Sequence, residues 1–214
     1  MTTPQEQFWA GEFGDAYIQR NQSAELAAAN AAFFAAILQR TGPIGTALEI
    51  GANVGMNVRA LQLLQPSLAI TAVEINPQAA AELRRLDCEV IEGSILDWAP
   101  PAGAYDLVFT KGVLIHIGPD ALPAVYERMA AGSRRYVVVA EYYNPTPVAI
   151  PYRGHNDRLF KRDFAGDFLD RYPEFDLVDY GFCYHRGVFA QDDITWFLLE
   201  RRSTGSAGAD DAEG

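Results

Sequence analysis

The fold is decided by ALEIGANVGMN, residues 47–57. An apolar run ends there in a carboxylate, Glu49, and two glycines, Gly51 and Gly55, bound a short turn before a helical pattern. Glycine adopts backbone conformations closed to other residues and allows a ligand to approach the backbone closely. A strand, a tight turn and a helix in this order are typical of a nucleotide-binding α/β fold.

A second carboxylate, Glu74, ends the next apolar run, residues 68–73. An acidic residue at that place binds ribose hydroxyls in such folds, so the two carboxylates predict a cofactor with an adenosine half. A pyrophosphate loop is missing, because Asn53 and Met56 stand where Gly-x-Gly-x-x-Gly needs glycines. A Walker loop is excluded because no Gly-Lys-Ser/Thr follows. The pattern instead resembles class I S-adenosylmethionine (SAM) methyltransferases.

Composition describes one globular domain of 214 residues with a net charge of −11. This charge argues against a nucleic-acid partner. No apolar run is long enough to span a membrane, and we expect no signal peptide at the polar N-terminus. Cys88 and Cys183 lack metal-type spacing, so we expect buried reduced thiols, no metal site and a cytoplasmic location.

Alternating elements predict a single Rossmann-like α/β domain over residues 1–202, with helices on both faces of a mostly parallel seven-stranded sheet. A C-terminal antiparallel hairpin closes the sheet. We expect residues 203–214 to form a disordered acidic tail. The predicted strands are 46–50, 69–74, 88–92, 105–110, 136–141, 176–183 and 194–200, and the predicted helices are 23–39, 54–64, 77–86, 119–132 and 163–171.

Ligands in such sheets bind beyond the carboxyl ends of the strands. The methyltransferase resemblance implies that glycines after the first strand line the methionine half of SAM, and that the next strand ends hold the ribose and adenine. Residues 7–42 would form an N-terminal helical segment, whose aromatic part could close over SAM as a lid or instead pack on the sheet. The residues so assigned to the cofactor are Tyr17, Arg20, Glu49, Gly51, Asn53, Gly55, Glu74, Ile75, Gly93, Ser94, Ile95, Thr110, Lys111 and Gly112. Asn53 and Ser94 depart from the usual glycine and aspartate, and Glu49 could instead only orient the loop.

Four residues are candidates for a catalytic base: His116, His155, Glu141 and Tyr143. Neutral imidazole suits this task, since it protonates near pH 6.5. His116 follows the fourth predicted strand, where many SAM methyltransferases carry a histidine, so we expect the rate to fall below about pH 6.5. The alternative is a hydrogen-bonded core histidine.

Cations are concentrated in residues 152–163, within a predicted acceptor-site insertion at 142–175. Arginine suits carboxylates and phosphates, which favours a small anionic acceptor. The alternative is a solvated face paired with Asp157 and Asp163. The residues assigned to the acceptor are Tyr142, Tyr152, Arg153, Arg158, Lys161, Arg162, His185 and Arg186.

Residues 7–200 resemble the pseudaminic acid biosynthesis-associated methylases. The resemblance is carried by residues 8–17, 47–57, 110–117, 141–147, 152–166 and 192–197. It implies O- or N-methylation of a sugar acid or precursor, with S-adenosylhomocysteine (SAH) as the second product. It leaves the oligomeric state open. Two other hypotheses are an NAD(P)-dependent reductase and a regulatory protein that binds SAM or a sugar without catalysis.

Overall fold

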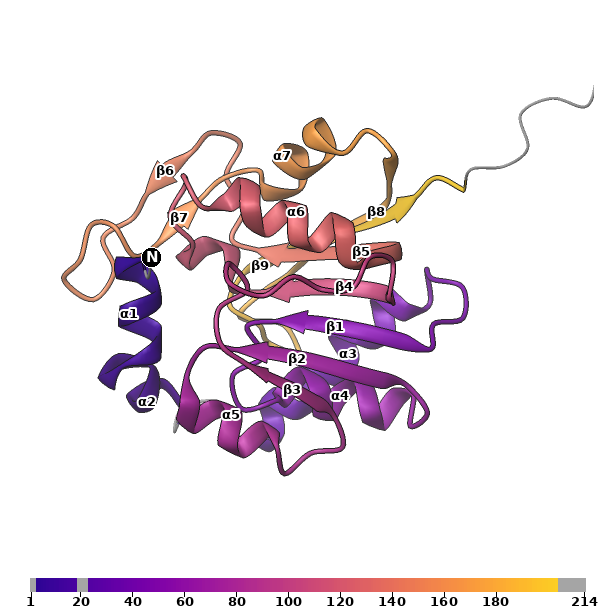
Figure 1. Cartoon of the computed structure of the whole chain (residues 1–214), viewed down its shortest axis with the longest axis horizontal. Helices are drawn as coiled ribbons and strands as arrows, with labels where there is room; N and C mark the ends of the chain where they lie inside the picture. The colour runs from indigo at the N-terminus through magenta and orange to yellow at the C-terminus, as the bar shows by residue number, and fades with distance from the viewer. Residues whose placement is uncertain (1–2, 19–22, 204–214) are drawn as a thin grey trace, which may run out of the picture.

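The computed structural model describes residues 3–18 and 23–203, so Arg20 and the tail after Ser203 lie outside the described residues. A seven-stranded sheet in the order β3-β2-β1-β4-β5-β9-β8 forms the centre (Figure 1). Its strands are β1 Thr46–Ile50, β2 Ala69–Glu74, β3 Glu89–Glu92, β4 Tyr105–Lys111, β5 Ser133–Glu141, β8 Phe175–Cys183 and β9 Ile194–Arg201.

Strand pairing confirms the predicted topology. β1 pairs in parallel with β2 and β4, and the sheet continues in parallel to β3 and β5. β9 is antiparallel to both β5 and β8, which makes the predicted C-terminal hairpin. The carboxyl ends of the five parallel strands therefore lie at one edge of the sheet.

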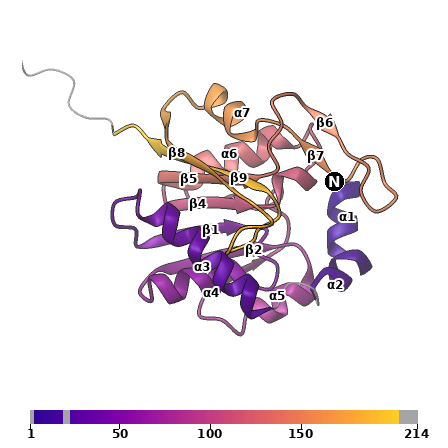
Figure 2. The same cartoon turned by 180° about the vertical axis from the view of Figure 1, so that it is seen from behind.

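Helices cover both faces, as the alternating pattern predicts. α3 (Ala24–Leu38), α4 (Met56–Leu64) and α5 (Pro77–Leu83) pack on one face through buried side chains such as Phe34 and Leu61. Figure 2 shows α3 and α4 crossing the sheet on that face. The short 3₁₀ helix η1 (Leu114–His116), α6 (Leu122–Gly132) and α7 (Phe164–Arg171) cover the other, with Met129 and Phe168 in the core.

Local capping signals in the sequence explain where several helices begin. The Ser23 hydroxyl accepts from the amide of Leu26 at the start of α3, and the Asn76 side chain caps α5 ahead of Pro77. α6 begins at Leu122, three residues later than predicted from Pro119. Residues 119–121 form a turn in place of the first helical turn, and earlier in this segment the amides of Val113, Leu114 and Ile115 donate to Glu141 of β5.

Two short helices and a small hairpin complete the described chain. α1 (Pro4–Ala10) and α2 (Glu12–Ile18) stand beside the carboxyl ends of the strands, toward which the arrowheads of β1 and β2 point (Figure 1). β6 (Val148–Ala149) pairs with β7 (Phe160–Lys161) in the segment between β5 and α7, a pair that was not predicted from the sequence.

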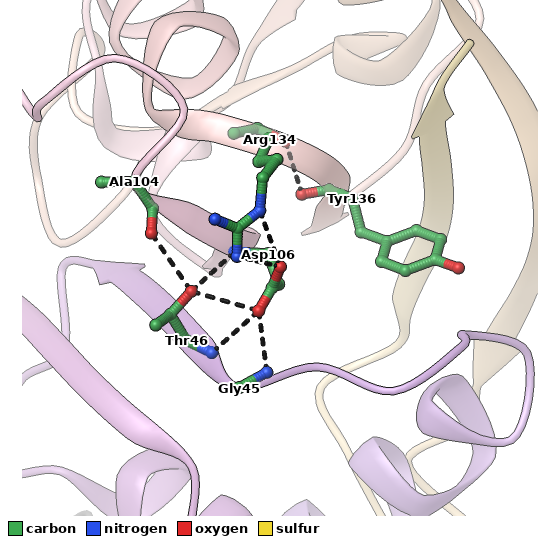
Figure 3. Close-up of polar contacts among 7 residues, drawn as sticks. Gly45, Thr46, Ala104, Asp106, Arg134 and Tyr136 are labelled. Atoms are coloured by element: carbon green, nitrogen blue, oxygen red, sulfur yellow. Dashed lines mark hydrogen bonds and ion pairs between the residues drawn. The ribbon is translucent and has the colours of Figure 1, made fainter. Parts of the chain in front are cut away.

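Asp106 holds the opposite edge of the sheet together (Figure 3). Its carboxylate accepts from the amides of Gly45 and Thr46 at 2.8 and 3.1 Å, and from the Arg134 guanidinium. Burial on its own raises the pKa of Asp106, but these hydrogen bonds outweigh it and lower the pKa below 3.8. The cluster ties the starts of β1, β4 and β5 at the edge away from the cofactor motif.

The described helices are all too short or too polar to cross a bilayer. Cys88 and Cys183 are free, and they are half-buried where the sequence predicted burial.

Candidate active site

A cavity of about 510 Å³ lies at the carboxyl ends of the parallel strands, and α1 and α2 form its outer wall. This volume falls in the range of about 300–1,000 Å³ that small-molecule sites usually have. Fourteen of the predicted site residues line it: Tyr17, Gly51, Asn53, Glu74, Ile75, Gly93, Ser94, Ile95, Lys111, Gly112, His116, Tyr142, Tyr152 and Arg153.

The turn after β1 has a backbone that few side chains allow. Gly51 and Gly55 have φ of 76° and 79°, and a Cβ at Gly51 would lie 2.6 Å from Val113. A Cβ at Gly55, the residue before α4, would lie 2.5 Å from Leu86, so Gly55 shapes the turn although it does not line the cavity. Asn53 between them has φ of 49°. Asparagine tolerates this left-handed region better than most residues, which explains how it replaces the usual middle glycine.

Glu74 at the end of β2 holds two loops in place. Its two oxygens accept from the amides of Asn53 and Asn76, each at 2.7 Å. Burial raises the pKa of Glu74, although these amides act in the opposite sense. Each carboxylate oxygen can accept a further hydrogen bond, and Glu74 lines the cavity, so its position suits a pair of hydroxyls.

Buried acceptors without a donor lie under the same turn. One oxygen of Glu49 accepts from Asn57 at 2.6 Å, whereas the other has no partner in the structure as described. The side-chain carbonyls of Asn53 and Asn57 are also buried and unpartnered. Burial raises the pKa of Glu49 to about 8. Unsatisfied buried acceptors are costly, so this set fits a ligand that donates hydrogen bonds, such as an ammonium group.

The ends of β3 and β4 supply a further part of the wall. Gly93 and Gly112 have φ of 144° and 69°, with open space where a side chain would stand, so a ligand can lie against the backbone. Ser94 accepts from the amide of Leu96, which rigidifies the turn. Thr110 is fully buried inside the sheet and does not reach the cavity wall.

His116 in η1 is the one predicted base that lines the cavity. Its Nδ1 lies 2.7 Å from the carbonyl oxygen of Arg158. A carbonyl only accepts, so Nδ1 carries the proton and the neutral ring keeps its lone pair on Nε2. Burial lowers the pKa of His116 to about 4, and the Arg158 carbonyl offsets this only in part. The prediction that His116 protonates near pH 6.5 is therefore wrong.

The other three predicted bases lie outside the cavity wall. Glu141 is fully buried, and its oxygens accept from the amides of Val113, Leu114 and Ile115. Burial raises the pKa of Glu141 to about 7. Tyr143 packs against Phe197, and His155 is exposed beside Phe8.

The outer wall of the cavity, formed by α1 and α2, carries aromatic side chains and is hydrogen-bonded to the start of α5. Trp9 packs on His116 with ring centroids 4.6 Å apart, and its indole nitrogen is buried without a partner in the described structure. Asn76 donates to the carbonyl of Trp9 and to Asp15, so the cap of α5 also fastens α1 and α2. Trp9 and Asn76 were not assigned to the site from the sequence, although the aromatic spacing of residues 8–17 marked that segment as a possible lid.

The cationic segment divides into residues that line the cavity and residues that do not. Tyr152 and Arg153 line the cavity, and Arg153 lies over the Tyr152 ring. Arg158 is paired with Asp157 and lies over Phe8. The remaining predicted acceptor residues also lie outside the cavity wall: Lys161 over the Tyr142 ring, Arg162 paired with Asp167, His185 bonded to Asp193, and exposed Arg186.

The loop before β9 closes the remaining side. Gln191 and Asp192 line the cavity together with Asn30 of α3, and none of these three was assigned from the sequence. The Asn30 side-chain carbonyl accepts from both Lys111 and Gln191 at 3.1 Å. Only tertiary packing joins these residues, because they are far apart in the chain.

A family model described as a methyltransferase domain matches residues 47–134, the segment from β1 to the start of β5. The matched segment includes Gly51, Glu74 and His116, so the part of the chain that forms much of the cavity wall is similar to a methyltransferase domain. No significant match was found among curated protein sequences.

Solved methyltransferases share the fold at low sequence identity. The Burkholderia thailandensis 1,6-didemethyltoxoflavin-N1-methyltransferase, solved with its substrate and SAH, is 18% identical with a TM-score of 0.67, covering 92% of this chain and 87% of that one. The magnesium protoporphyrin IX methyltransferase of Synechocystis PCC 6803, with bound SAH, is 13% identical with a TM-score of 0.66, covering 92% and 98%. The mitomycin 7-O-methyltransferase MmcR is 16% identical with a TM-score of 0.67, covering 94% and 61%.

Proposed function

We propose that the protein transfers the methyl group of SAM to an oxygen or nitrogen of a small anionic metabolite, such as a sugar acid or its precursor. The observation that carries this proposal is one cavity whose wall includes the glycine turn, the Glu74 carboxylate and the His116 imidazole. Bound SAM supplies an electrophilic methyl group on a sulfonium. The protein then has to hold the acceptor in line with it and to accept a proton where the acceptor releases one.

The residues fit SAM along the strand ends. Glu74 would accept from the ribose hydroxyls, since both its oxygens keep acceptor capacity. The turn at Gly93 would lie against the adenine, with Ser94 and Ile95 beside it. The unpartnered side-chain carbonyls of Asn53 and Asn57, which line the cavity, would accept from the amino group of the methionine end.

His116 is our choice for the base. Its ring is held through Nδ1, which leaves Nε2 as the atom that receives the acceptor proton. A pKa of about 4 makes the imidazole a weak base that is fully neutral at pH 7. Proton acceptance by His116 would matter for a hydroxyl acceptor and would be dispensable for an amine. Glu141 is better suited to hold η1, because three backbone amides use its oxygens.

The acceptor would enter beside Tyr142, Tyr152 and Arg153, which also line the cavity. An arginine there favours an acidic acceptor, in agreement with the resemblance of the sequence to sugar-acid-associated methylases. The similar solved enzymes include an N1- and a 7-O-methyltransferase, so this fold serves both nitrogen and oxygen methylation. A cytoplasmic location stays a prediction.

Calorimetry with SAM, SAH and NAD tests the cofactor. We expect SAH to bind with micromolar affinity, about −8 kcal/mol, and NAD not to bind. Release of SAH in the presence of a panel of sugar acids and matched neutral sugars tests the reaction. Binding of NAD in place of SAH would favour the reductase hypothesis, whereas SAH binding without turnover of any acid or neutral sugar would favour a regulatory protein.

A further inference from the structure

Lys111, the last residue of β4, occupies an unusual electrostatic position in the cavity wall. Its ammonium donates to the Asn30 carbonyl at 3.1 Å and lies over the Phe33 ring, 5.5 Å from the centroid. Asn30 is almost fully buried, at 2% exposure, and Gln191 at 6% donates to the same carbonyl oxygen. The head of Lys111 is therefore held by a built polar cluster on the α3 side of the cavity.

No ion pair of Lys111 occurs among residues 3–18 and 23–203, and Asn30 satisfies only one of its three N–H donors. Burial lowers the pKa of Lys111, and the charges of Glu49, Asp192 and Glu141 act in the opposite sense without forming an ion pair with it. Glu49 is hydrogen-bonded to Asn57 and Glu141 to backbone amides, and Asp192 lies on an exposed loop. A buried cation that no carboxylate pairs directly is costly, so a ligand anion would stabilise it.

We propose that Lys111, Asn30 and Gln191 form a carboxylate-binding subsite, and that this subsite, not the cations of residues 158–162 outside the cavity wall, holds the main negative charge of the bound ligands. Arg158 and Arg162 already form ion pairs, whereas Lys111 forms none within the described structure. The inference rests on the proposed function. Two carboxylates could fill the subsite: the methionine carboxylate of the cofactor, or that of an acidic acceptor. The unpartnered acceptors at Asn53 and Asn57 in the cavity wall favour the cofactor, because an α-amino acid brings an ammonium beside its carboxylate.

Lys111→Met tests the subsite, with Arg59→Met as a matched control. Arg59 is an exposed cation on α4 that does not line the cavity. Calorimetry would compare SAH with 5′-methylthioadenosine, which keeps the adenosine and the sulfur but has no amino-acid end. A second arm would titrate the SAH-loaded protein with N-acetylneuraminic acid and with its methyl ester, as probes of an acceptor carboxylate.

We expect Lys111→Met to weaken SAH binding at least tenfold and to leave 5′-methylthioadenosine binding unchanged, which assigns the cofactor carboxylate. Unchanged SAH affinity with loss of the preference for the acid over its ester would assign the acceptor carboxylate. The ligand-free melting temperature should stay level or rise, because an unpaired buried charge is removed.

The subsite proposal would be wrong if Lys111→Met bound SAH as tightly as the wild-type protein and kept its preference for the acid over the methyl ester. It would also be wrong if Lys111→Met weakened the binding of SAH and of 5′-methylthioadenosine equally. A lower melting temperature with unchanged SAH affinity would make Lys111 a structural residue. If the wild-type protein binds neither SAH nor 5′-methylthioadenosine, the proposed function itself fails, and that result is distinct from failure of the subsite.

Discussion

Replacing His116 by asparagine is expected to remove a pH-dependent destabilisation of the folded protein. Burial lowers the pKa of His116 to about 4 in the folded state, against about 6.5 in an unfolded chain. The unfolded state therefore binds the proton more tightly, and stability is lost as the pH falls from about 6.5 towards 4. Asparagine is the suitable replacement, because its amide can still donate to the Arg158 carbonyl.

The size of the stability change follows from the difference between the folded and unfolded pKa values of His116. At about 1.4 kcal/mol per pKa unit, the complete loss is roughly 3 kcal/mol. Between pH 7.5 and 5.5 the linkage relation gives a loss of about 1 kcal/mol for the wild-type protein relative to the variant. Glu49 and Glu141, whose pKa values are raised to about 8 and about 7, act in the opposite sense. Both are present in the two proteins, so their contributions cancel in the difference.

Urea denaturation of both proteins at pH 7.5 and 5.5 gives the four free energies of unfolding that the comparison needs. Nuclear magnetic resonance titration of the His116 ring gives its pKa directly. Parallel pH dependence in the two proteins, or a ring pKa near 6.5, would refute the argument that burial dominates at this residue.

Three further results are expected. Glu74→Gln should weaken SAH binding by about ten- to a hundredfold, because a hydrogen bond to a charged group contributes about 1.5–3 kcal/mol; calorimetry checks this, and Glu89→Gln on β3 should have no effect. Asp106→Asn should lower the free energy of unfolding by about 1–3 kcal/mol at pH 7. Because the pKa of Asp106 is depressed below 3.8, this difference should shrink as acid protonates the wild-type carboxylate, and denaturation at falling pH would show it. Arg153→Met should raise the acceptor KM in steady-state kinetics while Arg158→Met leaves it unchanged, and equal effects would contradict the division of the cationic segment.

The sheet and its helices were predictable because their signals are local. β4 is a nearly continuous apolar run, as a strand covered on both faces must be. Ser23 and the Asn76-Pro77 pair mark helix starts through their own side chains. The C-terminal hairpin followed from two strand patterns with no helix between them. These features depend on neighbouring residues in the chain, so the sequence alone was sufficient.

The functional detail depended on long-range contacts and was harder to predict. Glu141 ends a strand like Glu74, yet η1 folds onto Glu141 and uses its oxygens. In the cationic segment, a left-handed turn at Arg153 and the backbone pairing of Tyr152 with His155 decide which side chains face the cavity. Asn30 and Gln191 meet Lys111 only through packing of α3 and the loop before β9. No spacing rule in the sequence contains this information.

The left-handed backbone at Asn53 predicts which substitutions this position tolerates. A residue with a branched Cβ would pay about 1–2 kcal/mol for the conformation at φ of 49° and would strain the amide that binds Glu74. Glycine, asparagine and aspartate avoid most of that strain, although aspartate would set a carboxylate close to Glu74. In a saturation library selected for SAH binding, position 53 should therefore converge on glycine and asparagine. A motif written as backbone conformation, in place of residue letters, would include this chain and the glycine-rich methyltransferases alike.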